Sequence, residues 1–238
     1  MKKKSILLTA ILSIVSLSAF ALVGPKVEID NSGFDFGFAP QNAKLSHTFW
    51  IKSTGDEDLK IVKVIPGCGC TKAPLAKDVI NPGDSTTLEI IFSSKKYTGT
   101  IIKQPKFLTN TEDNNQVLAF QATIVNAPDS TYPLVISPFN LELAGMRPEI
   151  DNARFMIENK SEEDISIIVV EAATDFFTTK MPKKIKAGEK AEGMLQLLAA
   201  SADKSFAKSV TIELSDAAKT RYTIPVTYSK PAMTISNK

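Results

Sequence analysis

Short runs of alternating apolar and polar residues, separated by turn residues, fill most of the chain. In one such run Leu88, Ile90 and Phe92 alternate with polar or outward-facing positions, a period of two that is typical of strands with one buried face. Helical periodicity is weak apart from the N-terminal segment and residues 189–201, where Ala and Leu accumulate. We expect a strand there as well, because this stretch aligns with the strand-like residues 85–93 of a sequence repeat. The pattern therefore predicts an all-β protein.

The strand pattern occurs twice, with corresponding segments about 106 residues apart. In the first half the aligned segments are residues 34–37, 47–52, 54–58, 59–64 and 80–84, and in the second half they are residues 139–143, 153–158, 160–164, 165–170 and 185–189. In both halves a polar turn separates two apolar runs. A duplicated domain is the simplest explanation of this correspondence.

Each half holds roughly seven short strands in about 100 residues, which fits an immunoglobulin-like sandwich of antiparallel hairpins better than a closed barrel. We therefore predict two tandem immunoglobulin-like β-sandwich domains, at residues 22–126 and 134–230. A linker at residues 127–133 joins them and a tail at residues 231–238 follows. Because each half carries its own apolar strands, the two domains are expected to fold separately.

The N-terminus has the pattern of a cleaved signal peptide at residues 1–21. Three lysines precede an apolar run from Ile6 to Phe20, which ends in the small-residue pattern of Ala19 and Ala21. Cleavage there makes Leu22 the first residue of the mature chain, and an uncleaved anchor is the alternative. In a bacterium this predicts a periplasmic or extracellular protein with no membrane span after cleavage. Exposed thiols rarely stay reduced in that environment.

Charge argues against a nucleic-acid partner or a membrane-surface role. Without the three signal-peptide lysines, the 28 basic and 26 acidic residues become 25 and 26, so the mature chain has a net charge of about −1. A basic loop in the second half, which we interpret as a solvated face, contains Lys180, Lys183, Lys184, Lys186 and Lys190.

Both cysteines of the chain lie in Gly67-Cys68-Gly69-Cys70-Thr71, after a strand-like run. Two thiols separated by one glycine can form a local disulfide, ligate one soft metal ion, or occupy a tight backbone site for small residues. The first half also resembles a known family at several separate points. The segments that carry this resemblance are Asp35-Phe36-Gly37, His47-Thr48-Phe49, Thr54-Gly55-Asp56, Cys68-Gly69-Cys70-Thr71 and Pro82-Gly83.

Over residues 27 to about 125, these segments resemble a family of secreted bacterial domains of unknown function with a Cys-Gly-Cys-Thr signature. That family is related to the Hydin-type and PapD-like immunoglobulin folds. The resemblance implies the fold and the compartment, and it implies no reaction. The second half has Thr174-Asp175-Phe176 where the cysteines would fall, so it retains the scaffold without the cysteine pair.

A metal site is one hypothesis for the cysteine pair. A short turn joins the strands at residues 47–53 and 59–66, so we expect an antiparallel hairpin that brings His47, the one histidine of the chain, near Cys68. Two thiolates from Cys68 and Cys70 and one imidazole suit copper(I). Alternatively, His47 shares strand parity with Phe49 and is a hydrogen-bonded core histidine, and the cysteines have a structural role.

Motifs for catalysis are weak. No phosphate-binding loop or nucleophile elbow occurs, and one histidine supplies a single possible base. Cysteines that exchange disulfides are normally activated at a helix start or beside a cation, whereas this pair follows a strand. We therefore expect a non-enzymatic structural or interaction module of the cell envelope, with a protein partner and no cofactor. Copper(I) binding through Cys68 and Cys70 is the alternative, and thiol–disulfide exchange the second.

Overall fold

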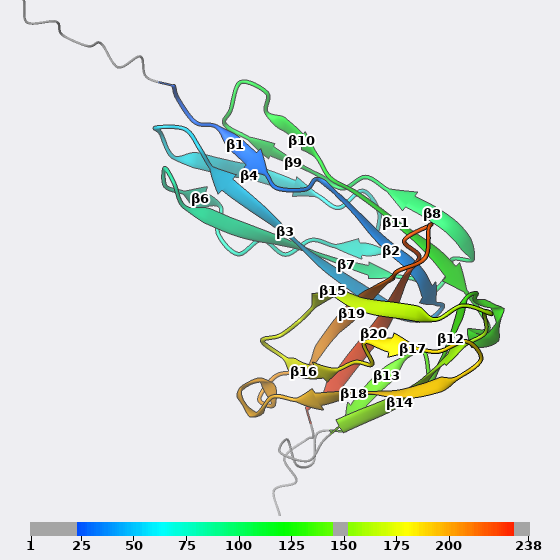
Figure 1. Ribbon diagram of the computed structural model, residues 1–238. Helices are drawn as coiled ribbons and strands as arrows, with labels where there is room; N and C mark the ends of the chain where they lie inside the picture. The colour runs from blue at the N-terminus through cyan, green and yellow to red at the C-terminus, as the bar shows by residue number, and fades with distance from the viewer. Residues whose placement is uncertain (1–22, 145–151, 231–238) are drawn as a thin grey trace, which may run out of the picture.

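A computed structural model of the chain describes residues 23–144 and 152–230 (Figure 1). The predicted signal peptide and the predicted tail lie outside the described residues. Within the described ranges, every regular element is a strand apart from the short 3-10 helices η1 (Pro128–Ser130) and η2 (Ala199–Ser201). The all-β prediction is confirmed.

The strands of the first half are β1 (Val27–Ile29), β2 (Gly33–Pro40), β3 (Lys44–Ser53), β4 (Leu59–Ile65), β5 (Thr71–Lys72), β6 (Val79–Ile80), β7 (Ser85–Ser93), β8 (Gly99–Lys103), β9 (Lys106–Thr109), β10 (Asn115–Val117) and β11 (Ala119–Val125). Those of the second half are β12 (Leu134–Ser137), β13 (Leu141–Ala144), β14 (Asn152–Asn159), β15 (Ile165–Ala172), β16 (Phe177–Lys180), β17 (Lys184–Ile185), β18 (Lys190–Leu197), β19 (Phe206–Leu214) and β20 (Arg221–Ser229).

The first half is built around one apolar core. One sheet has the strand order β1-β3-β7-β5, a second has β10-β9-β4-β6, and strands β2, β11 and β8 complete the domain. Along β7 buried residues alternate strictly with partly exposed ones, as the period of two predicts. Five fully buried phenylalanines, each from a different strand, lie in the core: Phe36, Phe49, Phe92, Phe107 and Phe120.

The second half has a separate core between the sheet β12-β14-β18-β16 and strands β15, β17, β19, β20 and β13. Its buried members all lie within residues 134–228, and those of the first core within residues 36–124. Each predicted domain range thus contains one core. The ambiguous stretch at residues 189–201 forms strand β18 followed by η2, so the strand expectation holds for most of it.

Two expectations about strand pairing are wrong. The strands are not all antiparallel, because β2 pairs in parallel with β11 and β13 in parallel with β20. The hairpin of β3 with β4 does not form either: β3 pairs with β1 and β7, whereas β4 pairs with β6 and β9. The connecting turn is bonded to the segment before β1, with Thr54 N donating to Lys26 O and Asp56 N to Gly24 O. The turn therefore carries the chain from one sheet to the other.

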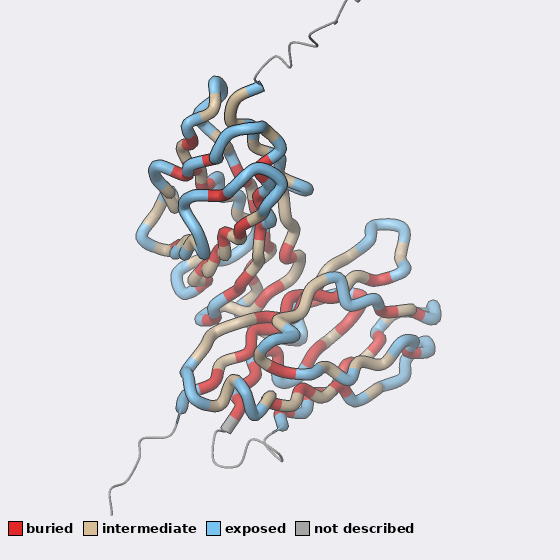
Figure 2. Tube along the Cα trace, turned by 90° about the vertical axis from the view of Figure 1, so that its left-hand side faces the viewer, coloured by how far each residue is buried: buried red, intermediate tan, exposed pale blue. Residues whose placement is uncertain are grey.

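The two domains meet where β2 lies beside β20, at the bridge between Phe38 and Tyr222. Through this bridge one sheet continues across the molecule in the order β17-β15-β19-β20-β2-β11-β8. Thr223 Oγ1 also donates to the backbone oxygen of Phe36, at 2.6 Å. Buried positions run along the strands that meet here, whereas exposed positions gather in the loops (Figure 2). The junction thus fixes one domain against the other.

Candidate functional site

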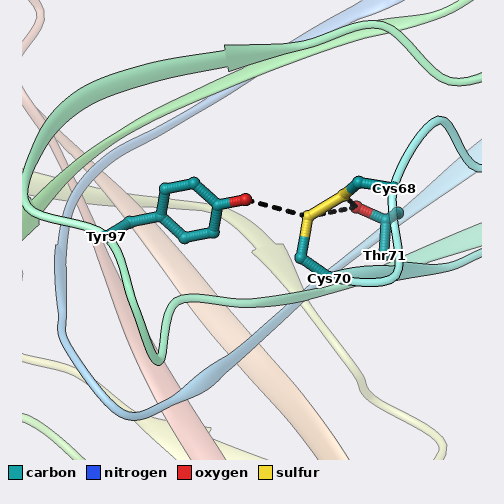
Figure 3. Close-up of a disulfide and its surroundings, with 4 residues drawn as sticks. All are labelled: Cys68, Cys70, Thr71 and Tyr97. Carbon is teal, nitrogen blue, oxygen red and sulfur yellow. Dashed lines mark hydrogen bonds between the residues drawn. A yellow bond between two sulfur atoms is a disulfide. The ribbon is translucent and has the colours of Figure 1, made fainter.

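Cys68 and Cys70 form a disulfide in the loop that follows β4 (Figure 3). The hydroxyl of Tyr97 donates a hydrogen bond to Cys70 Sγ at 3.2 Å, and Thr71 Oγ1 lies 3.4 Å from Cys68 Sγ. Both cysteines are half-buried, whereas Gly69 between them is exposed. A Cβ atom at Gly69 would meet no other atom within 4 Å. The loop therefore presents its glycine to solvent and keeps its sulfur atoms against the protein.

Backbone hydrogen bonds hold this loop to the β1-β3-β7-β5 sheet. Ser93 N donates to Cys70 O at 2.8 Å, and the next residue, Thr71, is the first of β5, which pairs with β7. The ring of Tyr97 packs against Phe92 of the first core, with 5.3 Å between ring centroids. The disulfide loop is consequently a rigid wall at the edge of the sheet.

We expect the double variant Cys68→Ser/Cys70→Ser to lose well under the roughly 3 kcal/mol of unfolding free energy that a 15-residue disulfide loop provides. The two cysteines are separated by two positions in sequence, so the bond removes little entropy from the unfolded chain. Urea unfolding of the oxidised wild type and the variant measures the difference, with reduced wild type as the control. A loss of about 3 kcal/mol or more would show that the disulfide does more than close its own short loop.

The structure places His47 at the domain junction, away from any bond to the cysteines. Its ring stacks on Phe34 with 3.7 Å between centroids and meets the ring of Phe49 edge-on. His47 Nδ1 is bonded to Glu171 Oε2, and Thr48 N donates to Glu171 Oε1 at 3.1 Å. Glu171 belongs to β15 of the second domain, so one carboxylate joins two consecutive residues of β3 to the other domain.

This placement removes the geometric reason for adding His47 to a metal site. Over residues 23–144 and 152–230, no group of three or more His, Cys, Asp or Glu side chains is arranged to hold a metal ion. Copper(I) binding by reduced Cys68 and Cys70 and thiol–disulfide exchange both stay predictions. In the structure the two sulfur atoms are bonded to each other.

Replacing Glu171 by alanine is expected to lower the free energy of unfolding by about 1–3 kcal/mol, because the Thr48 N–H and the His47 ring both lose their bonding partner in a half-buried junction. The control is Glu162→Ala, at an exposed turn position of the same domain. Chemical denaturation of both variants gives the comparison. Equal stabilities of the two variants would mean that the carboxylate does not hold the domains together.

Further polar contacts fix the junction along β19. Ser209 Oγ donates to Ser46 O at 2.9 Å and lies 3.0 Å from Ser46 N, which donates to it. Lys208 Nζ donates to Glu89 Oε1 at 2.6 Å, with both side chains less than a fifth exposed. The same ammonium lies 4.5 Å from the centre of the Phe176 ring. Lys208 and Phe176 both line two hollows at the domain boundary, and we call their contact the partition between these hollows.

On the disulfide side of the partition lies a groove of about 570 Å³, which we call the lysine groove. Its walls are the disulfide loop with β5 and β7 from the first domain, and β19 with the end of β20 from the second. Side chains that line it include four lysines, Lys44, Lys72, Lys204 and Lys208, and three aromatic residues, Phe176, Phe206 and Tyr228. No Asp, Glu or His side chain is among its described lining residues.

The hollow on the other side is larger, about 900 Å³, and differs in chemistry. It is lined by the half-exposed Trp50 and by His47, and also by Glu89, Glu171 and Asp175. Acidic and basic residues line this hollow together, so its charge is mixed. Several of these polar groups also bond one another across the junction. Of the two hollows, the lysine groove is the one whose described lining carries charge of a single sign, so we take it as the candidate functional site.

Sequence reasoning singled out two components of this groove, Gly69 and Cys70 of the cysteine motif, and did not place the others there. Phe176 is the residue that aligns with Cys70 in the repeat, and the two corresponding positions line the same groove. The basic loop of the second domain, which the sequence did single out, is largely neutralised. Its ion pairs are Lys184–Asp164, Lys190–Glu158 and Lys186–Glu189.

Several solved structures are similar to the chain. A protein of unknown function from Porphyromonas gingivalis W83 has 13% sequence identity and a TM-score of 0.36, with 85% of this chain and 99% of that chain covered. The ASH/PapD-like domain 7 of human CEP192 has 11% identity and a TM-score of 0.36, covering 43% and 87%. The CupB2 chaperone of Pseudomonas aeruginosa has 12% identity and a TM-score of 0.27, covering 79% and 95%.

A search of the curated proteins finds no match. Residues 27–124, which run from β1 almost to the end of β11 and include the disulfide loop, match the model of a family described as "Protein of unknown function (DUF1573)". This match covers less than half of the chain, so it shows that the first domain is similar to this family of unknown function.

Proposed function

We propose that the chain is a non-enzymatic protein-interaction module of the cell envelope and that the lysine groove is its binding surface. The observation that carries this proposal is the composition of the groove. Exposed lysines surround an aromatic floor at the junction of two domains. Such a combination of apolar contact area and a few charged groups is typical of recognition surfaces.

The groove favours binding over acid–base chemistry. Catalytic acids and bases at neutral pH are usually His, Asp or Glu, and the described lining contains none of them. The imidazole of His47 lies on the other side of the partition and is engaged with Glu171. The lysines that remain can attract and orient an anionic partner.

A fixed junction makes the groove suitable for recognition. Its two walls come from different domains, so their separation depends on the bonds between Ser46 and Ser209 and between Lys208 and Glu89. A surface held in its binding geometry before the partner arrives pays less ordering entropy on association. The disulfide loop stiffens one wall in the same way.

An envelope location is supported by two independent features. The first is the signal-peptide pattern of residues 1–21. The second is the disulfide itself, because such bonds persist mainly in oxidising compartments. Within the described part of the chain, no helix has the length and apolar character needed to cross a membrane.

Photo-crosslinking in living cells tests the proposal. A photoreactive amino acid is placed at Ser229, an exposed groove residue at the end of β20, and at Glu162 as the exposed control. We expect illumination to join the full chain to a specific envelope protein from position 229 and not from position 162. The proposal fails if neither position gives a protein adduct, or if both give the same adducts.

A further inference from the structure

We propose that the lysine groove binds an acidic polypeptide segment of the partner in an extended conformation. This inference rests on the proposed function and adds the chemistry of the partner. Three properties of the groove lead to it: unbalanced positive charge, partly exposed aromatic surface, and a strand edge with which no other strand pairs.

The positive charge of the groove predicts that the partner is negatively charged. Lys44 on β3, Lys72 on β5 and Lys204 in the loop before β19 are exposed and take part in no ion pair within the described residues. Lys208 differs from them, because Glu89 already neutralises it. Three cations from separate segments thus converge on a groove whose described lining has no carboxylate. Complementary charge on a partner increases association rate and discriminates against basic partners.

Apolar contacts indicate that the partner is more than a small anion. Phe176 and Phe206 are partly buried, with 4.9 Å between their ring centroids, and both line the groove. Ile91 of β7 lines the opposite wall and is also partly exposed. Aromatic and aliphatic surface of this kind is covered by apolar side chains, which a polypeptide can supply between its acidic residues.

The strand edge favours a polypeptide over an anionic polysaccharide or polyphosphate. Pairing of β15 with β19 ends at Ala172 and Val210. Beyond that point residues 206–209 pair with β20 alone, and within the described residues no backbone hydrogen bond covers their other edge. Phe206 and Lys208 of this segment line the groove. An extended chain laid along such an edge gains main-chain hydrogen bonds, as in recognition by strand addition.

The test uses a fluorescein-labelled capped peptide of about ten residues that alternates glutamate and valine, so that as a strand it has one acidic and one apolar face. We expect it to bind the full mature chain in fluorescence anisotropy, and more weakly as salt concentration increases. The variant Lys44→Glu/Lys72→Glu/Lys204→Glu should bind roughly tenfold more weakly or worse, because three attractions become repulsions.

The matched control is Lys60→Glu/Lys180→Glu/Lys183→Glu, which makes the same change of net charge at exposed positions outside the groove. Its affinity should stay within about twofold of wild type, since only the general field of the protein changes. Thermal unfolding establishes that both variants are folded. Equal losses of affinity in the two variants would show non-specific attraction and overturn the inference.

Three further probes carrying the same label separate the possible ligands. A lysine–valine peptide should not bind. A glutamate–valine peptide with alternate backbone nitrogens methylated should bind much more weakly, because it cannot pair along one edge. Polyphosphate should bind more weakly than the unmodified peptide. If the methylated peptide or polyphosphate binds as tightly, the extended-polypeptide inference is wrong.

The outcome also separates this inference from the proposed function. If the glutamate–valine peptide does not bind while position 229 still crosslinks to an envelope protein, the groove is an interaction surface for a partner of other chemistry. If neither result is obtained, both the function and the partner class are rejected.

Discussion

Replacing Gly37 by alanine is expected to lower the free energy of unfolding by about 2–5 kcal/mol. Gly37 has a φ of +62°, in the left-handed region that costs other L-residues roughly 1–2 kcal/mol. A Cβ atom there would also lie 2.0 Å from the backbone oxygen of Arg221. Since neither backbone can yield without separating β2 from β20, the collision adds an overpacking cost of about 1–3 kcal/mol.

Gly99→Ala is the matched control for this variant. Gly99 has a similar φ of +73°, but a Cβ atom there would meet nothing within 4 Å. The difference between the two variants in urea unfolding therefore isolates the contact between the domains from the backbone strain. If the two variants lose the same free energy, β2 and β20 do not approach as closely as described. Because the lysine groove has walls from both domains, Gly37→Ala should also weaken binding of the glutamate–valine peptide.

The architecture could be predicted from the sequence because it depends on local patterns of apolar and polar residues. Alternation along β7 and the polar turns after β3 and β14 specify strands wherever one face is buried. The repeat then implies two copies of the same fold, and the two separate cores agree with it. The segment at residues 189–201 illustrates the value of the repeat. Its composition favours a helix, yet most of it forms β18, which pairs with both β14 and β16.

Strand pairing was harder to predict because the sequence of a turn does not determine which sheet the strand after it joins. The turn at residues 54–58 is short enough for a hairpin, but it connects β3 and β4 in different sheets. What decides the outcome is the set of bonds from Thr54 and Asp56 to the segment before β1. Those partners lie more than one strand away in sequence. The prediction that His47 lies near Cys68 depended on this hairpin. Because the hairpin does not form, that prediction has no support.

The groove could not be predicted because its components become neighbours only after the domains dock. Lys208, which lines the groove, and its partner Glu89 are 119 positions apart, and no short-range pattern relates them. Lys44 and Lys72 look like ordinary outward-facing strand residues in the sequence. Even Phe176, which the repeat aligns with Cys70, looked like a position that had merely lost its cysteine. The cysteine pair was conspicuous because residue type and spacing alone identify it.

Tyr222→Ala is expected to lose about 3–5 kcal/mol of unfolding free energy, the range for truncating a large buried aromatic side chain. The side chain of Tyr222 is fully buried in the second core. Its ring centroid lies 5.3 Å from that of Phe38 in the first domain and 6.3 Å from that of Phe139. The variant thus leaves a cavity at the point where the two domains meet. Thermal or urea unfolding measures the loss, with Tyr132→Ala at a 64% exposed position as the control.

Tyr222→Phe separates the hydroxyl from the ring. Leu134 N donates to Tyr222 Oη at 3.0 Å, and in the variant this buried N–H loses its acceptor. We expect a loss of about 1–3 kcal/mol, the cost of leaving one buried polar group unsatisfied. A loss as large as that of Tyr222→Ala would contradict the assignment of most of the effect to ring packing.

The same hydroxyl predicts how stability responds to alkaline pH. Burial raises the pKa of Tyr222 above its ordinary value of 10.0 in the folded protein. The folded state therefore retains a proton that the unfolded state releases, so the contribution of this group to the free energy of unfolding is fully present below pH 10 and decreases above it.

Above pH 10 the free energy of unfolding should decrease by about 1.4 kcal/mol per pH unit for one proton. In urea unfolding series between pH 9 and 11, Tyr222→Phe should show a shallower loss of stability than wild type, with a difference in slope that approaches one proton at the upper end of the range. Tyr132→Phe, at an exposed position, is the control and should keep the wild-type slope. If Tyr222→Phe also retains that slope, the tyrosine is not buried as a neutral group at the domain junction.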